Sequence, residues 1–228
     1  MIVYGRNAVR EAIRGPRRVR TVWATKGAAA DFPGALPANA DQIARRAGSD
    51  GHQGVCADVE DYRYADAGEL LRVADPVLVA LDEVTDPQNL GAICRSAECT
   101  GATGVVLPER RSAEVTPAVC KASAGAVEHL AIAQVRNLAD FLADAKAAGC
   151  WTYGAAAGGR TPYRQVNWTD GVVLVLGAEG RGLRPRVAAA CDDLVALPLR
   201  GRIDSLNVSA TAAVLLYEIL QQRLDAST

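Results

Sequence analysis

From residue 76 onward, short apolar runs alternate with segments that have the composition of helices. The runs are rich in Val, Leu and Ile and lack polar alternation, which is typical of strands covered on both faces. Strands are predicted at Val77–Leu81, Gly104–Leu107, His129–Ala133, Trp151–Ala155, Val172–Leu176 and Leu194–Leu197. Helices are predicted at Gly91–Cys99, Pro117–Ala124, Leu138–Ala148, Pro185–Ala190 and Val208–Leu220. This alternation predicts an α/β fold with an open parallel sheet, in which ligands bind at the carboxyl ends of the strands.

A smaller unit precedes this region. Its pattern predicts helices at Gly5–Arg14 and Asp41–Ala47 and strands at Val19–Ala24 and Gly54–Val59. A Gly/Ala/Pro-rich stretch at Gly27–Ala40 separates the first strand from the second helix. Such a unit is too short to bury much apolar surface alone. We therefore expect a small α/β domain over residues 1–60, a charged linker or connecting helix over 61–75, and a larger domain over 76–228.

The composition excludes several classes of protein. Half of the residues are hydrophobic, but no uninterrupted apolar run approaches the roughly 18 residues of a membrane span. The N-terminal residues lack the apolar stretch of a signal peptide, so we expect a cytoplasmic protein with no membrane contact. Six scattered cysteines without a C-x-x-C pair, and only two histidines, argue against a metal site. The cysteines are interpreted as small apolar residues in a reducing compartment.

Charge is distributed unevenly along the chain. Residues 1–26 carry seven basic side chains against one acid, a net charge of +6, which leaves −7 for the remainder of a chain whose total is −1. A basic terminus on an acidic body indicates contact with a polyanion, although a solvated helix face of ordinary arginines gives the same pattern.

One polar cluster follows the predicted strand Val77–Leu81. The sequence DPQNLG at residues 86–91 places Asn89 at the expected start of a helix, and Arg95 follows six residues later. A guanidinium offers several fixed donors that suit a phosphate or a developing oxyanion. A surface arginine on an amphipathic helix is the alternative interpretation.

Two further clusters follow later strands. The first is LGAEGRGL at 176–183, whose glycines allow close approach of the backbone and whose Glu179 needs a partner in an apolar turn. Its G-x-x-G-x-G spacing is neither the dinucleotide fingerprint nor a phosphate loop, which disfavours a Rossmann oxidoreductase. The second cluster places Ser205 and Asn207 at the mouth of the last helix, where free N–H groups accumulate, unless they only cap that helix.

Together these clusters would supply Asn89, Arg95, Glu179, Ser205 and Asn207 to one site. The set contains no histidine and no cysteine–histidine pair, so neither proton abstraction nor metal chemistry is the obvious task. Amides, one arginine and glycine-rich backbone suit a reactive cofactor that brings its own chemistry.

The same residues carry a family resemblance. DPQNLGAICRSAECTGATGVVLP, LVLGAEGRGL and LPLRGRIDSLNVSATAAVLLYE resemble, in order and spacing, the three motifs of the SpoU (TrmH) family of RNA ribose 2′-O-methyltransferases. YGRNAVREAI and the HQGV at 52–55 resemble the N-terminal, ribosomal-protein-like RNA-binding module of the bacterial 23S rRNA guanosine 2′-O-methyltransferase. Because tRNA-modifying members generally lack that module, the resemblance favours ribosomal RNA.

The resemblance implies a SPOUT-type domain with a deep C-terminal trefoil knot, and a homodimer packed through the knot and the C-terminal helix. It implies S-adenosylmethionine as cofactor, yielding S-adenosylhomocysteine, held largely by backbone. The residues implied in cofactor binding are Ala155, Ala156, Gly158, Leu176, Gly177, Gly180, Leu197, Leu199, Leu206 and Ser209. Position 155 is an alanine where relatives often carry a hydroxyl, which removes one polar contact.

Carried over by position, the catalytic residues are Asn89, Arg95, Glu179, Ser205 and Asn207. The implied reaction is in-line methyl transfer to a ribose 2′-oxygen, accelerated mainly by alignment. A guanidinium with a pKa above about 12 is a poor base at neutral pH, so Arg95 is expected to stabilise the incipient alkoxide. Ser205 and Asn207 are expected to orient the ribose and the cofactor, and Glu179 to hold Arg95 or Asn89 in place.

RNA binding is expected from the basic N-terminal unit. The residues implied are Arg6, Arg10, Arg14, Arg17, Arg18 and His52. The stretch between Lys26 and His52 is shorter than in relatives and rich in Pro and Ala, which weakens the expectation about RNA specificity more than that about the chemistry. The alternatives are a tRNA-specific or adenosine-specific, antibiotic-resistance type of 2′-O-methyltransferase, and a non-catalytic RNA-binding or ribosome-assembly protein.

Overall fold

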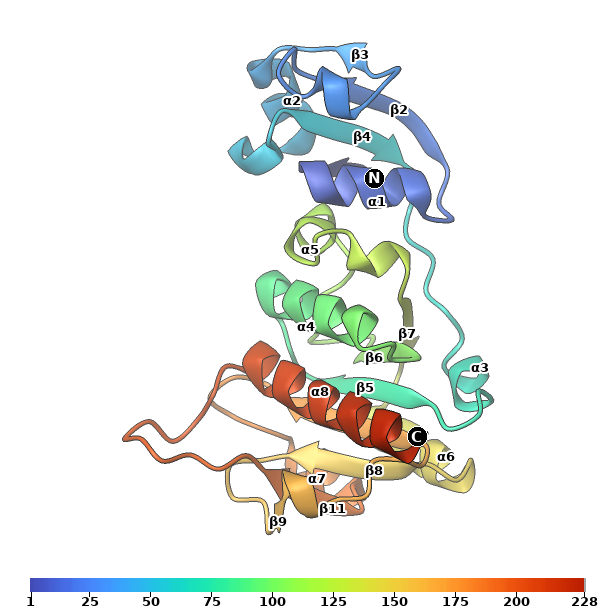
Figure 1. The fold of residues 1–228 in the computed structure, drawn as a ribbon, viewed down its shortest axis with the longest axis vertical. Coiled ribbons are helices and arrows are strands. Elements are labelled where there is room, and N and C mark those ends of the chain that lie inside the picture. Colours follow the sequence, from blue (N-terminus) through green and yellow to red (C-terminus); the bar gives the residue numbers. More distant parts are fainter. Residues whose placement is uncertain (228) are drawn as a thin grey trace.

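Two β-sheets lie one above the other along the long axis of the molecule (Figure 1). The computed structural model describes residues 1–227. The smaller sheet has the strand order β1-β4-β2-β3, in which β4 pairs antiparallel with both β1 and β2. Its strands are β1 (Ile2–Tyr4), β2 (Val19–Ala24), β3 (Leu36–Pro37) and β4 (Val55–Val59), and its helices are α1 (Arg6–Arg14) and α2 (Ala40–Ala47).

The larger sheet is parallel throughout, with the order β7-β6-β5-β10-β8-β11-β9. Its strands are β5 (Val77–Asp82), β6 (Gly104–Pro108), β7 (Ala131–Val135), β8 (Trp151–Ala155), β9 (Thr161–Pro162), β10 (Val172–Gly177) and β11 (Asp193–Ala196). Its helices are α3 (Ala67–Leu71), α4 (Pro87–Cys99), α5 (Pro117–Ala122), α6 (Leu138–Ala147), α7 (Pro185–Ala190) and α8 (Val208–Ala226). The predicted parallel α/β sheet is thereby confirmed.

Alternate residues of the central strands pack on opposite faces of this sheet. Val77 and Val79 join the apolar cluster that includes α4, α5 and α8, whereas Leu78 and Ala80 join the cluster that includes α3, α6 and α7. Because both faces are covered, the strands are apolar in consecutive positions.

Several elements differ from the prediction at their ends, and α8 continues to Ala226, beyond the predicted Leu220. Helix α4 begins at Pro87, four residues before the prediction, because the Asp86 carboxylate accepts a hydrogen bond from the Gln88 N–H (2.9 Å) and proline suits the first helical position. Strand β7 begins at Ala131 rather than His129, because a short 3-10 helix occupies 126–128. The short strands β1, β3 and β9 were not predicted, since so few residues carry no periodicity.

Within residues 1–227, no helix is both long and apolar enough to cross a membrane. Over the same residues, no group of three or more His, Cys, Asp or Glu side chains is arranged to hold a metal ion.

Candidate functional site

Loops that follow three strands of the larger sheet meet beside the start of α8. Strands β5 and β10 are neighbours in register, with Asp82 opposite Gly177, so the loops after them leave the sheet side by side. The first loop leads into α4, where Asn89 is buried in the first turn. The loop after β11 leads to Asn207, the residue that caps α8. The three polar clusters identified in the sequence therefore converge.

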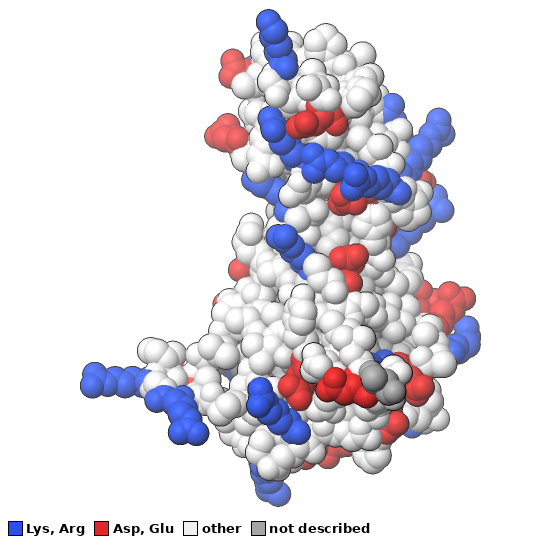
Figure 2. Space-filling view, viewed as in Figure 1, with Lys and Arg blue, Asp and Glu red and all other residues white. Residues whose placement is uncertain are grey.

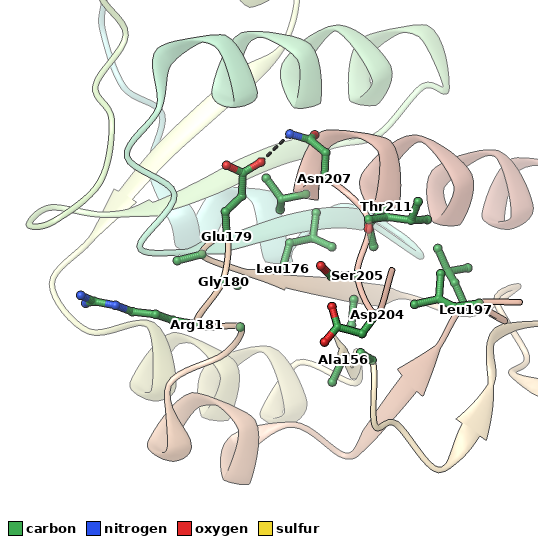
Figure 3. A pocket seen from close by; sticks show the side chains of 18 of the residues that line it. Ala156, Leu176, Glu179, Gly180, Arg181, Leu197, Asp204, Ser205, Asn207 and Thr211 are labelled. Atoms are coloured by element: carbon green, nitrogen blue, oxygen red, sulfur yellow. Dashed lines mark hydrogen bonds between the residues drawn. The ribbon is translucent and has the colours of Figure 1, made fainter. Parts of the chain in front are cut away.

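Asn207 joins the three clusters through one side chain. Its Oδ1 accepts hydrogen bonds from the N–H of Ser209 (2.8 Å) and from the Ser209 hydroxyl (2.6 Å), which caps α8. Its Nδ2 donates to Oδ1 of Asn89 (3.0 Å) and to a carboxylate oxygen of Glu179, the bond dashed in Figure 3. A terminal amide that both donates and accepts is suited to bridging a helix N-terminus, a second amide and a carboxylate.

The glycine-rich turn after β10 is closed by its own backbone. The N–H of Gly182 donates to the carbonyl of Ala178 (2.9 Å). A Cβ on Gly177 would lie 2.2 Å from the carbonyl carbon of Gly182, so only glycine fits there. Gly180 and Gly182 have positive φ values of 73° and 65°, which glycine adopts without strain.

A buried carboxylate anchors the far end of the same turn. Asp82, fully buried at the end of β5, accepts hydrogen bonds from the Arg184 N–H and from its Nε, both at 2.7 Å. The guanidinium of Arg184 also lies 3.4 Å from Oε1 of Glu83. The turn is therefore held at both ends in a single position relative to the sheet.

These loops enclose a cavity of about 660 Å³ between β10, β11 and the start of α8 (Figure 3). This is within the range of roughly 300–1,000 Å³ typical of small-molecule sites. Of the residues expected to bind the cofactor, those that line the cavity are Ala155, Ala156, Leu176, Gly177, Gly180, Leu197, Leu199 and Leu206. Three expected catalytic residues line it too: Glu179, Ser205 and Asn207.

Four expected site residues lie outside the cavity lining. Asn89 reaches the site only through Asn207, and Gly158 is not part of the wall. The Ser209 hydroxyl donates its hydrogen bond to Asn207. Arg95 is exposed on α4, and no hydrogen bond or ion pair to its guanidinium is found among the described residues.

One expected partnership is corrected by these contacts. Glu179 was expected to hold Arg95 or Asn89, but its carboxylate accepts a hydrogen bond from Asn207 instead. Figure 3 shows the Asn207 side chain, at the start of α8, pointing toward Glu179, and the same amide nitrogen also donates to Asn89 of α4.

Sequence reasoning missed several wall residues. Small or apolar side chains such as Ala157, Ala178 and Leu215 carry no chemical signal of their own, and Thr211 lies in a mostly apolar stretch of α8. Asp204 directly precedes Ser205 and Arg181 directly follows Gly180, so their positions next to expected site residues could have indicated them. The wall thus offers two carboxylates, one guanidinium, one amide and the hydroxyls of Ser205 and Thr211. No histidine or cysteine is among these lining residues, so the wall can bind and orient a reactive group better than it can move protons.

The residues expected to bind RNA fall into two groups. Arg6, Arg14 and Arg18 are exposed and Arg10 is half-buried, all on the N-terminal unit. The side chains of Arg17 and His52 are buried and cannot contact RNA at the surface. The Arg17 guanidinium forms a buried ion pair with Glu128, and Nδ1 of His52 accepts a hydrogen bond from the Gly54 N–H (2.9 Å). Both side chains hold the protein together instead of facing solvent.

Figure 2 shows Lys and Arg side chains in a band across the N-terminal unit, and two more at the tip of the loop between β11 and α8. The two loop arginines are Arg200 and Arg202. Positive charge thus occurs both on the N-terminal unit and on a loop that continues into the cavity wall.

Comparison with known proteins gives a consistent result. Residues 76–217 match the model of the SpoU rRNA Methylase family, and residues 2–65 match the model described as RNA 2′-O ribose methyltransferase substrate binding. The TrmH family protein YacO of Bacillus subtilis (strain 168) is 35% identical over 97% of this chain and 95% of its own length. The uncharacterized tRNA/rRNA methyltransferase slr0955 of Synechocystis sp. is 40% identical over 97% of this chain, which spans 62% of that longer protein.

Solved structures share the architecture of both units. The SpoU methyltransferase AviRb from Streptomyces viridochromogenes, in complex with AdoMet, superposes with a TM-score of 0.82 at 26% identity, over 98% of this chain and 90% of AviRb. An AdoMet-bound rRNA methyltransferase from Sinorhizobium meliloti gives a TM-score of 0.81 at 28% identity, over 96% of this chain and 86% of that one. The chain therefore belongs to the SpoU rRNA methylase family, a family of S-adenosylmethionine-dependent RNA methyltransferases.

Proposed function

We propose that this protein transfers a methyl group from S-adenosylmethionine to a ribose 2′-hydroxyl of ribosomal RNA in the cytoplasm, with a guanosine of 23S rRNA as the target. The observation that carries the proposal is the single amide of Asn207, which joins all three family motifs at the wall of a cavity of cofactor size. The substrate-binding unit at residues 2–65 supports RNA as the substrate.

The cavity wall suits this cofactor. The sulfonium and ammonium groups of S-adenosylmethionine are cationic, and Glu179 and Asp204 place carboxylates on the wall. The apolar side chains of Leu176, Leu197 and Leu206 offer surfaces for an adenine ring. When bound, the cofactor supplies an electrophilic methyl group.

The residues of the chain then have separate tasks. Asn207 and Ser205 orient the groups that meet at the start of α8, where the N-terminal partial positive charge favours a developing oxyanion. Asn89 fixes the amide of Asn207, so its role is positional. Arg95, exposed and without a partner among the described residues, is free to contact the RNA and steady the 2′-oxygen or a neighbouring phosphate.

We also propose a homodimer and a C-terminal knot. The outer face of α8 and the loop before it expose apolar side chains, among them Tyr217 (54% exposed), Val214 (42%) and Ile203 (74%). An apolar surface of this kind is typical of an interface with a second copy. The knot is supported by the insertion of β10 between β5 and β8 and by the return of the chain after β11 to pack α8 against α4.

The function is tested by transfer of a labelled methyl group from S-adenosylmethionine to RNA from cells that lack this protein. Ribosomal RNA should accept the label and tRNA should not, and digestion should yield one 2′-O-methylated nucleoside at one mapped position. Label on tRNA, or on adenosine, would replace the stated target by one of the alternatives. Absence of transfer to any RNA would refute the enzymatic proposal.

A single variant tests the role of Arg95. Arg95→Ala should abolish transfer and leave the affinity for S-adenosylmethionine within about threefold, or roughly 0.7 kcal/mol, of the wild type in calorimetry. Arg72→Ala is the matched control, because Arg72 is also exposed but lies just before β5, at the opposite end of the strand. A fully active Arg95→Ala variant would remove the assignment.

A further inference from the structure

The N-terminal unit and the larger domain share one apolar core. Helix α1 packs beside α5 and the 3-10 helix at 126–128 (Figure 1). Val9 and Ala12 of α1 belong to the same buried cluster as Val119 and Val127 of the larger domain. Buried apolar side chains of the two units are therefore packed into one cluster across the boundary.

A buried ion pair crosses this boundary. Arg17, in the turn between α1 and β2, donates from Nε to Oε2 of Glu128 (2.8 Å) and from Nη2 to Oε1. The side chains of Arg17 and Glu128 are only 8% and 0% exposed. Burial alone would lower the pKa of Arg17, but the hydrogen bonds and charge of Glu128 outweigh it, so the pKa is raised and the guanidinium stays charged.

Arg17 also contacts residues 60–62, where the N-terminal unit ends and the connecting segment begins. Its Nη1 donates to the carbonyl of Glu60 (2.9 Å), and its guanidinium lies 5.6 Å from the ring centre of Tyr62. One side chain thus contacts the N-terminal unit, the connection and the larger domain. Its fork of donors is suited to holding three elements in fixed directions.

The connecting segment itself is tied to the larger domain. The Tyr62 hydroxyl donates to the carbonyl of Leu130 (3.1 Å), and the Ala65 N–H donates to the carbonyl of Ile132 (2.8 Å). Ala65 also pairs with Ala133 of β7 as an isolated bridge. A hinge here would have to break these bonds, so the connecting segment is held against the larger domain.

We propose that Arg17 and Glu128 are positioning residues for RNA specificity: they fix the N-terminal unit at one distance and angle from the cavity. The proposal rests on the proposed function. RNA bound to a rigidly held unit can present only the ribose that lies at the matching distance. A swinging unit would present several.

The physical reason to assign orientation rather than stability to this pair is its burial. A buried ion pair contributes little net stability compared with apolar side chains of similar volume, because both charges lose their hydration. It does, however, penalise every arrangement in which the two charges separate within the interior. The pair therefore discriminates between docked orientations better than a purely apolar contact does.

The test uses the full chain with Arg17→Met/Glu128→Met, which removes both charges and keeps long side chains. A second variant, Glu128→Lys, sets another cation against Arg17. The matched control is Arg186→Met/Asp140→Asn, which removes an exposed ion pair between α7 and α6, outside the segment whose exchange is measured. The measurements are amide hydrogen exchange at Tyr62–Ala65, calorimetric affinity for S-adenosylmethionine, and mapped methyl transfer to ribosomal RNA.

Both boundary variants should exchange faster at Tyr62–Ala65 and keep the cofactor affinity within about twofold, since the cavity is elsewhere. Transfer to the wild-type ribose should fall by at least about tenfold in kcat/KM, because small misplacements of a reactant are costly, and label should appear at additional riboses. The control should match the wild type in all three measurements. If Glu128→Lys proves unfolded by circular dichroism, the double variant decides alone.

Wild-type exchange together with wild-type site selectivity in the double variant would overturn the proposal. If the wild-type chain transfers no methyl group to RNA, the proposed function fails. In that case the exchange rates still decide whether the pair holds the N-terminal unit, because they need no substrate.

Discussion

Replacing Asn207 by alanine removes the side chain whose hydrogen bonds join the three loops. The variant loses the cap of α8, which costs about 1 kcal/mol. It also leaves Oδ1 of Asn89 without this donor in a buried site, which costs about 1–3 kcal/mol. Glu179 is exposed and becomes hydrated, so its lost bond adds little. The expected loss is about 2–4 kcal/mol, a large share of the roughly 5–15 kcal/mol typical of a domain.

The assay is unfolding in urea, where the loss should lower the midpoint without changing the slope. Asn137→Ala is the matched control, because Asn137 caps α6 through the Ala139 N–H (3.0 Å) and makes no other side-chain hydrogen bond among the described residues. It should lose only the capping contribution of about 1 kcal/mol. Asn207→Ala should also weaken S-adenosylmethionine binding by about tenfold or more, or roughly 1.4 kcal/mol. Equal destabilisation of the two variants, with unchanged cofactor affinity, would refute the bridging role.

Three further predictions concern the turn, an acidic group and the thiols. Gly177→Ala sets a Cβ 2.2 Å from backbone across the turn, so cofactor affinity should fall in calorimetry; Gly27→Ala, where the Cβ meets nothing within 4 Å, should retain it, and equal affinities would contradict the steric argument. Burial raises the pKa of Asp192, but its hydrogen bonds and the charge of Lys146 outweigh this and lower it below 3.8, so its contribution is present above that value and lost as pH falls through the lowered pKa. The difference in unfolding free energy between wild type and Asp192→Asn should therefore be full above the usual aspartate range and shrink as the pH falls below 3.8, and a pH-independent difference would argue against the assignment. Cys99 is exposed, Cys191 is partly exposed, and the other four cysteines are buried. Burial raises the pKa of each of the five thiols other than Cys99, so Ellman's reagent should modify Cys99 quickly in the native protein; fast modification of any of the four buried thiols would contradict this.

Much of the larger domain was predictable because its strands are covered on both faces. Runs such as Val172–Leu176 are apolar in every position, and the structure extends this run by only one residue, to Gly177. Helices were predictable where polar caps or proline marked their starts, as for α5 and α7. Short strands such as β3 and β9 were missed, because two residues in a ladder have no pattern of their own.

The candidate site was predictable as a set of residues but not as a set of contacts. The polarity of Asn89, Glu179 and Asn207 at the ends of apolar strands marked them in the sequence. That one amide joins the other two side chains depends on the packing of α8 against α4, across a sequence separation of 118 residues between Asn89 and Asn207. The exposed position of Arg95, outside the cavity lining, depends on the same packing.

The sequence by itself determined the parallel α/β sheet, the three motifs and the family, because these follow from local composition and order. Only the tertiary structure decided which basic residues face solvent. In the sequence, Arg17 is indistinguishable from the other arginines of a basic stretch. In the structure its guanidinium is buried in an ion pair with Glu128, 111 residues away, and does not face solvent. Charge and periodicity are properties of a segment, whereas burial is a property of what folds against it.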